Sequence, residues 1–149
     1  MSSPITFEWI AADDPRMEAV NELRHEALFA PFGIPRHDGW DDAGSDRHHL
    51  VALADGRVVG YSCLLLDTPA SGHIRQVSVR EDLRGGGIGA GLMAEVESHA
   101  RALGLASVWL DARCTAEGFY HACGYETTSG VFPSGRTQLP HVRMNKPLL

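Results

Sequence analysis

A glycine-rich stretch in the second half of the chain constrains the fold more than any other feature of the sequence. Five of the seven residues 85–91 are glycine, and they lie between a predicted strand at 73–80 and a predicted amphipathic helix at about 87–103, whose apolar stripe ends at Leu103. A backbone without side chains can approach a ligand closely, and the amides at a helix N-terminus attract anions. Because each glycine weakens a helix by about 1 kcal/mol, this composition favours a phosphate-binding turn over an accidental loop.

Two well-known phosphate-binding patterns fit this turn poorly. A P-loop requires Lys followed by Ser or Thr after its last glycine, which residues 90–92 do not offer. A dinucleotide fingerprint fits Gly85, Gly87 and Ala90, with Asp111 about 20 residues further on. However, the strand in that fold runs straight into the first glycine, and here too little chain follows Asp111 for a second half-sheet.

The remaining sequence predicts a mixed α/β fold of the α+β kind, in which helices flank a sheet. Strands are expected at 5–11, 49–54, 57–66, 73–80, 106–112, 125–132 and 141–146, and helices from Pro15 to about 29, at 87–103 and at 115–122. Asp55 followed by Gly56 predicts a type I′ turn between two strands. In the fourth strand the apolar residues change parity between Ile74 and Val77, which predicts a β-bulge.

Size and composition are those of a single domain spanning residues 1–149, with 44% hydrophobic residues. No apolar stretch approaches the ~18 residues of a membrane span and the N-terminus lacks a secretory signal, so a cytoplasmic protein with no membrane partner is expected. Cys63, Cys114 and Cys123 form no CxxC pair, which argues against a disulfide framework or a zinc site. The net charge of -6 argues against a nucleic-acid partner and is weakly compatible with a cationic substrate.

A third phosphate-binding pattern, R-x-x-G-x-G/A, is met by Arg84, Gly87 and Gly89, and at this point the chain resembles the GCN5-related N-acetyltransferase (GNAT) family. The resemblance extends over residues 74–79, the helix after the turn and residues 118–125. It also includes the closing segment 139–144, which looks like that of a small bacterial branch of the family whose substrate is uncertain. The order and spacing of these segments, taken together, are specific. The resemblance implies a GNAT-like, mostly antiparallel central sheet with splayed middle strands.

The resemblance also implies acetyl-CoA as the co-substrate, with its pantetheine arm lying like an added strand between the strands 73–80 and 106–112. Backbone groups near Val77 and Val79 would pair with the pantetheine amides, although the side chains of both residues can equally be plain core. Main-chain amides from Arg84 to Ala90 would hold the diphosphate. The full set of implied binding residues is Val77, Ser78, Val79, Arg84, Gly85, Gly86, Gly87, Ile88, Gly89 and Ala90.

Two residues are implied to carry the chemistry. On the pattern Phe-Tyr-x-x-x-Gly-Tyr, Tyr120 takes the place of the family's general acid for the departing thiolate, with packing beside Phe119 as the alternative. His141 has the right ordinary pKa to act as the base, and a structural histidine is an equal alternative. Weaker candidates for the base are His25, Glu26, His73 and Gln76.

Several residues near the implied site remain outside this assignment. Many family members carry Asn where this chain has Arg113, so that pantetheine contact is in doubt. An acyl-enzyme on Cys114 or Cys123 is a minor alternative, because no base is evident nearby. His37, His48 and His49 show no ligand spacing, so no metal is expected and all three are interpreted as solvated loop or strand edge.

The sequence therefore predicts an N-acetyltransferase that moves an acetyl group to a primary amine of a small molecule or peptide by direct attack. A non-catalytic CoA-binding regulatory module and a dinucleotide-binding oxidoreductase are the alternatives. The acceptor itself is not revealed, because it would be recognised by loops such as 36–47, a polar connection that is the best candidate for a mobile loop. Whether two copies form a homodimer is likewise open.

Overall fold

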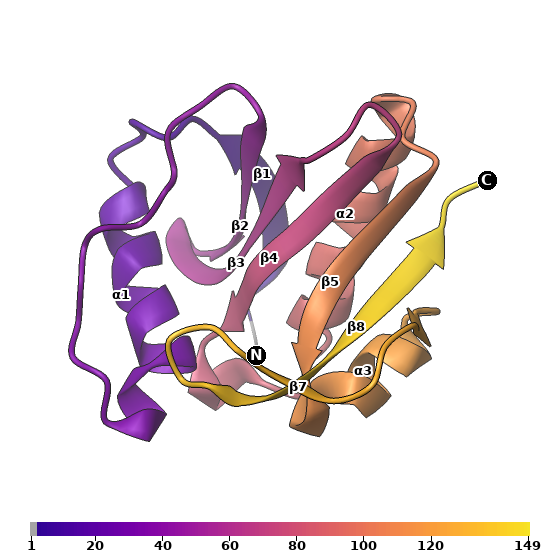
Figure 1. Ribbon diagram of the computed structural model, residues 1–149. Helices are drawn as coiled ribbons and strands as arrows, with labels where there is room; N and C mark the ends of the chain where they lie inside the picture. Colours follow the sequence, from indigo (N-terminus) through magenta and orange to yellow (C-terminus); the bar gives the residue numbers. More distant parts are fainter. Residues whose placement is uncertain (1–2) are drawn as a thin grey trace.

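Eight strands form one sheet in the computed structural model, which describes residues 3–149 (Figure 1). The strands are β1 (Ile5–Ile10), β2 (Arg47–Ala54), β3 (Arg57–Leu66), β4 (Ser71–Val79), β5 (Ser107–Arg113), β6 (Glu126–Thr127), β7 (Phe132–Ser134) and β8 (Leu139–Pro147). The helices are α1 (Met17–Leu28), α2 (Ile88–Ala102) and α3 (Glu117–Ala122), with short 3-10 turns at Ala30–Phe32, Glu81–Leu83 and Cys114–Ala116. The sheet order is β1-β2-β3-β4-β5-β8-β6, with β7 beside β8. The pairing of β4 with β5 is parallel and the others are antiparallel, which confirms the predicted mixed, mostly antiparallel sheet.

Helices cover both faces of the sheet, as Figure 1 shows for α1 and α2. Successive side chains of a strand point to opposite faces. In β2, accordingly, Leu50 and Ala52 are buried in the cluster that contains α2, while Val51 and Leu53 are buried in the cluster that contains α1. Within the described residues, no helix is long and apolar enough to cross a membrane.

The hairpin between β2 and β3 has the predicted turn. Asp55 and Gly56 have positive φ angles of 52° and 76°, and Ala54 pairs with Arg57 across the two-residue loop. These angles are those of a type I′ turn, which Asp and Gly accept. Strand β2 begins two residues earlier than predicted, because residues 47 and 48 also pair with β3.

The predicted bulge is confirmed in β4 at Gln76, whose φ of 59° is left-handed. Tyr61 pairs with Ser78 but Cys63 pairs with Arg75, so β4 contains one more residue than β3 over this stretch. The Ser78 hydroxyl donates to the Gln76 carbonyl at 3.0 Å and stabilises the bulge. As a result, the apolar residues on either side of the parity change contact the same core as α2.

Strands β4 and β5 splay apart as the resemblance implied. They pair only from Ser71 with Ser107 to His73 with Trp109. Beyond that point β5 remains paired with β8 as far as Arg113, and β4 remains paired with β3. The gap therefore opens toward the C-terminal ends of both strands.

Two details of the predicted elements are wrong. Leu103 is 44% exposed, because the backbone of α2 ends at this residue in a Schellman motif. There Leu105 donates to the Ala100 carbonyl at 3.0 Å and its side chain is buried in place of that of Leu103. The strand predicted at 125–132 is reduced to β6, because the Ser129 hydroxyl accepts the Arg143 amide at 2.8 Å and replaces a ladder bond.

A buried arginine ties the long connection between α1 and β2 to the rest of the fold. Arg24 on α1 has no exposed surface. Its guanidinium donates to both carboxylate oxygens of Asp42 at 2.8 Å and to the Gln76 side chain at 2.9 Å. It also lies 4.0 Å from the centre of the Trp40 ring. The connection predicted to be a loop is therefore held against the bulge of β4.

We expect Asp42→Asn to lower the free energy of unfolding by about 2 kcal/mol at pH 7, because it leaves the buried Arg24 charge unpaired. The Asp42 side chain is 20% exposed, so water can partly replace the lost carboxylate, and the expected loss is smaller than for a fully buried pair. Burial alone would raise the pKa of Asp42, but the hydrogen bond and charge of Arg24 outweigh it and lower this pKa. The difference between variant and wild type should therefore begin to shrink as the pH falls below about 4, the ordinary pKa of an aspartate in the unfolded chain, and should be lost only below the lowered pKa of Asp42 in the folded protein.

Urea unfolding at pH 7 and pH 3.5 measures this effect. The matched control is Asp38→Asn in the same connection, whose 69% exposed carboxylate pairs with Arg36 and should contribute under about 0.5 kcal/mol. Equal losses in the two variants would contradict the role given to Arg24.

Candidate active site

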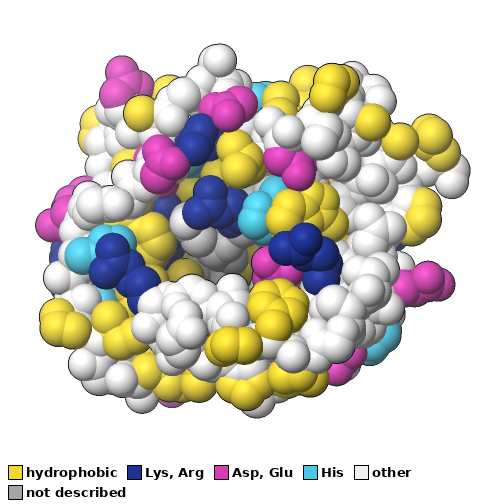
Figure 2. Space-filling view, in the orientation of Figure 1, with side chains coloured by type: hydrophobic (Ala, Val, Ile, Leu, Met, Phe, Trp, Pro, Cys, Tyr) yellow, Lys and Arg dark blue, Asp and Glu magenta, His cyan; other side chains and the backbone are white. Residues whose placement is uncertain are grey.

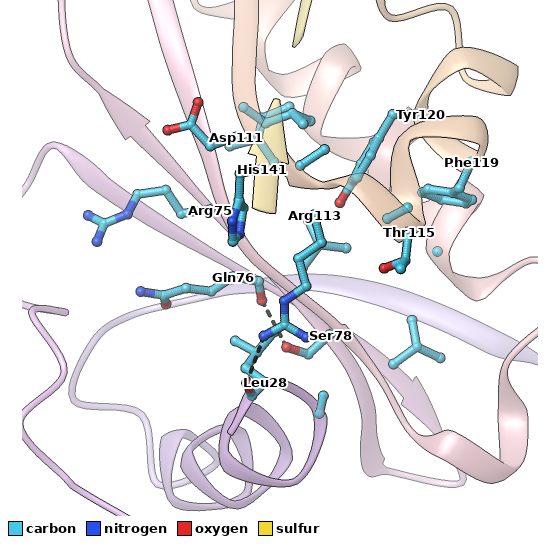
Figure 3. A pocket seen from close by; sticks show the side chains of 18 of the residues that line it. Leu28, Arg75, Gln76, Ser78, Asp111, Arg113, Thr115, Phe119, Tyr120 and His141 are labelled. Carbon is cyan, nitrogen blue, oxygen red and sulfur yellow. Dashed lines mark hydrogen bonds between the residues drawn. The ribbon is translucent and has the colours of Figure 1, made fainter. Parts of the chain in front are cut away.

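A cavity of about 850 Å³ lies where β4 and β5 diverge (Figure 3). Its walls come from β4, β5, the glycine-rich turn, the start of α2, α3, the end of α1 and the segment between β7 and β8. Among the residues implied by the sequence, those lining the cavity are Val77, Ser78, Val79, Arg84, Gly85, Gly87, Gly89, Ala90, Tyr120 and His141. Gly86 and Ile88 do not line it; Gly86 is exposed and the Ile88 side chain is buried against the sheet. The contacts expected of these two residues are main-chain ones.

The glycine-rich turn presents free amides to this cavity. Gly85 and Gly87 have left-handed φ angles of 81° and 91°, and a Cβ at either would meet no atom within 4 Å. No hydrogen bond within residues 3–149 engages the amides from Gly85 to Ala90. The Arg84 amide already donates to the Glu81 carbonyl at 3.4 Å, so the cradle of free amides begins one residue later than expected. Unpaired amides at a helix N-terminus fit an anion such as a diphosphate.

Two other glycines of the same run lie close against aromatic rings. A Cβ on Gly89 would lie 3.1 Å from the ring of Phe119, and one on Gly91 would lie 2.5 Å from the ring of Phe7. The second distance is too short for any real contact. The glycine run therefore combines a ligand-facing turn with close approach of two aromatic rings to α2.

Tyr120 on α3 both packs and faces the cavity. Its ring meets Phe119 and Tyr125 edge-on, with centroid distances of 5.0 Å and 6.0 Å. Figure 3 shows its hydroxyl directed into the cavity, near Arg113 and Thr115. Burial raises the pKa of Tyr120 well above its ordinary value, so the phenol stays protonated and can donate a hydrogen bond.

His141 on β8 faces the same cavity from the strand beside β5, where it pairs with Arg113. Its Nδ1 lies 2.6 Å from the Leu139 carbonyl oxygen. Because a carbonyl oxygen can only accept, Nδ1 carries the proton and Nε2 retains its lone pair in the neutral ring. A free Nε2 that faces the cavity suits a base. The bond from Nδ1 to the Leu139 carbonyl is equally what a structural histidine would make.

The weaker candidates for the base divide into two groups. His73 and Gln76 line the cavity, whereas His25 and Glu26 do not. His73 stacks on Trp109 at 3.6 Å, and burial lowers its pKa to about 4, so it is neutral at pH 7. The Gln76 amide oxygen accepts from Arg24 at 2.9 Å, which fixes it in a structural role.

The cysteines and the other histidines do not contribute to the cavity wall. Burial raises the pKa of the Cys123 thiol, which opposes an acyl-cysteine route. The interpretation of His49 as a solvated edge is wrong, because it is 1% exposed and bonds the Tyr61 hydroxyl at 2.7 Å. Nδ1 of His48 lies 2.7 Å from Nε2 of His99, and the His37 ring stacks on the Trp40 ring with their centroids 4.6 Å apart. Residues 3–149 contain no cluster that could hold a metal ion.

Arg113 is the main feature of the cavity that the sequence left unassigned. Its side chain reaches from β5 to the end of α1, where Nη2 donates to the Leu28 carbonyl at 2.7 Å (Figure 3). The guanidinium also lies 4.8 Å from the centre of the Phe32 ring. Burial lowers the pKa of Arg113, but an arginine remains charged at any working pH. It therefore closes one side of the cavity and brings a positive charge into it.

Comparisons with known proteins agree with this geometry. The sequence profile of the acetyltransferase (GNAT) family matches residues 17–125. An IAA acetyltransferase from Azospirillum brasilense is 33% identical over 149 residues, covering 93% of this chain and 97% of the relative. A solved acyl-CoA N-acyltransferase from Pseudomonas aeruginosa has a TM-score of 0.79 at 26% identity, covering 96% of this chain and 99% of its own. An aminoglycoside 6'-N-acetyltransferase in complex with coenzyme A shares the fold, with a TM-score of 0.79 at 16% identity over 97% of both chains.

Proposed function

The chain belongs to the acetyltransferase (GNAT) family, and from that premise we propose that it transfers the acetyl group of acetyl-CoA to a primary amine of a small molecule or peptide. The observation that carries this proposal is the run of free amides from Gly85 to Ala90 at one end of a cavity that also holds Tyr120 and His141. Such a cavity accommodates an extended thioester with its phosphates at the helix N-terminus. The family also opposes the dinucleotide-binding oxidoreductase considered from the sequence.

Acetyl-CoA supplies an activated thioester, and the residues of this chain orient it and manage the protons. The edge of β4 at Val77 and Val79, which β5 leaves unpaired, offers main-chain groups to the pantetheine amides. The Val79 carbonyl already accepts a hydrogen bond from Arg84 Nε at 3.2 Å, which pantetheine would have to replace. His141 Nε2 takes a proton from the acceptor ammonium, directly or through a water molecule, and frees the amine for attack. The Tyr120 hydroxyl donates a hydrogen bond to the departing thiolate. Its raised pKa makes complete proton transfer uphill, so solvent finally protonates CoA.

Melting and turnover together test this proposal. Acetyl-CoA should raise the melting temperature and NADH should not, because a ligand stabilises the state that binds it. A panel of primary amines should then release free CoA thiol only when the acceptor is present. Stabilisation by acetyl-CoA without turnover of any amine would favour the CoA-binding regulatory module, and no stabilisation would contradict the proposal as a whole.

We expect His141→Gln to lower kcat/KM about tenfold at pH 7, because water is a poorer base for the acceptor ammonium. The loss should diminish as the pH approaches the pKa of the acceptor amine, since the amine is then already deprotonated. A pH profile of kcat/KM measures both effects. The control is His48→Gln, outside the cavity wall, which should leave the profile unchanged. A pH-independent loss would leave His141 with a structural role only.

A further inference from the structure

The charge inside the cavity is opposite to that of the whole chain. The sequence has a net charge of -6. The charged residues that line the cavity are Arg75, Arg84, Arg113 and Arg136 against Asp111. Figure 2 shows dark blue Lys and Arg side chains around a hollow on this face of the molecule. A local excess of positive charge at a cleft raises the concentration of anions there.

None of these four arginines has a carboxylate partner in the part of the chain that the structure describes. Arg84 and Arg113 donate to the main-chain carbonyls of Val79 and Leu28, whereas among the described residues the structure gives the side chains of Arg75 and Arg136 no hydrogen bond. Neither Arg75 on β4 nor Arg136, between β7 and β8, forms an ion pair within residues 3–149. The carboxylate of Asp111 is engaged by Arg143, at 2.9 Å and 3.2 Å. The guanidinium groups of Arg75 and Arg136 are thus free to bind an anion.

The expected position of the CoA diphosphate does not account for these two charges. Arg84 is part of the glycine-rich turn, which follows the end of β4 at Val79. Arg75 precedes Val79 by four residues, which span three residues of β3 because of the bulge, so Arg75 lies roughly 10 Å toward the other end of the gap. Arg136 lies on the segment between β7 and β8, which Figure 1 shows reaching across toward α1. His141 also lines the cavity, and in the view of Figure 3 its ring projects between the side chains of Arg75 and Arg113.

We propose that the acceptor carries an anionic group, a carboxylate or a phosphate, in addition to its amine, and that Arg75 and Arg136 bind this group. The inference rests on the proposed function and narrows its acceptor class. Guanidinium groups bind both anions through paired hydrogen bonds, which orient the bound group in addition to neutralising its charge. With the anion held there, the amine would lie beside His141. The charge of the cavity therefore favours an acceptor that carries an anionic group beside its amine, whereas the net charge of the chain is compatible with a purely cationic acceptor.

The test compares acceptors that share a skeleton and differ in the anion. The sets are phenylalanine, its amide and phenethylamine; 4-aminobutyrate, its amide and butylamine; and phosphoethanolamine with ethanolamine. Free thiol release gives kcat/KM for each with the full chain. In at least one set the anionic member should be preferred about tenfold or more, and which set responds distinguishes carboxylate from phosphate.

Arginine variants assign the preference to its residues. Arg75→Gln and Arg136→Gln should each raise KM for the preferred anionic acceptor about tenfold, with kcat and the uncharged amide within twofold of wild type. The control is Arg57→Gln, an exposed arginine outside the cavity wall, which should change nothing. Melting temperatures with and without acetyl-CoA show that each variant is folded and binds the co-substrate.

The outcomes separate this inference from the function on which it rests. If acetyl-CoA stabilises the protein and uncharged amines are used best, the anionic acceptor alone is rejected. If acetyl-CoA stabilises the protein and no amine is used, acetyl transfer itself is rejected, and this inference with it. A preference that survives in both arginine variants also rejects this inference. If acetyl-CoA fails to bind, the proposed function itself is wrong.

Discussion

The Gly87→Asp variant should bind CoA about 100-fold more weakly than wild type, a loss of about 2.7 kcal/mol. Gly87 lines the cavity with a φ of +91° and precedes the first residue of α2. A carboxylate at this position would repel the diphosphate and occupy space beside the free amides. Isothermal titration with CoA measures the affinity directly.

Backbone strain from replacing a glycine with positive φ could also weaken binding, so its effect must be separated from loss of the free amides of the turn. Gly104, at the other end of the same helix, provides the match, because its φ is +80° and a Cβ there would also meet nothing within 4 Å. Gly104→Asp should lose stability, since an acidic residue at a helix C-terminus is unfavourable, yet it should bind CoA like wild type. Equal affinities for CoA in the Gly87 and Gly104 variants would show that the turn does not bind phosphate.

Tyr120→Phe should lower kcat about 100-fold while the affinity for acetyl-CoA stays within twofold. The ring remains to pack against its neighbours, and only the hydroxyl that faces the cavity is lost. The magnitude is at the lower end for an acid catalyst, because a phenol with a raised pKa acts by hydrogen bonding more than by complete proton transfer. Single-turnover and steady-state thiol release give the two constants.

Tyr125→Phe is the matched control for this prediction. Tyr125 is also buried and its hydroxyl donates to Glu97 at 2.9 Å, but it is absent from the cavity wall. Its variant should lose stability and keep kcat. If Tyr120→Phe has wild-type kcat, the tyrosine has only its packing role.

Features set by neighbouring residues were predictable from the sequence. The turn at Asp55 and Gly56 follows from local backbone preferences. The bulge at Gln76 was predictable because a change of parity in a strand has few other causes. The glycine-rich turn was identified by composition and position, although the packing reasons for Gly89 and Gly91 depend on rings distant in the sequence.

Features set by distant residues were not predictable. The buried environment of His49 depends on its bond to Tyr61 on the next strand and on the connection held by Arg24. Arg113 was visible only as an unusual residue, because its partner Leu28 lies 85 residues earlier in the chain. The sign of the charge inside the cavity was not predictable from the net charge, since a sum over the chain contains no information on where each charge lies.

The most direct test of the central claim is a titration of the ¹⁵N-labelled protein with CoA, followed amide by amide in ¹H–¹⁵N NMR spectra. If the free amides of the turn bind the diphosphate, resonances from Gly85 to Ala90 should show the largest shifts and saturate together, with smaller changes at Val77 and Val79. If the resonances of the turn stay in place at millimolar CoA, the turn does not bind the coenzyme and the proposed reaction is contradicted.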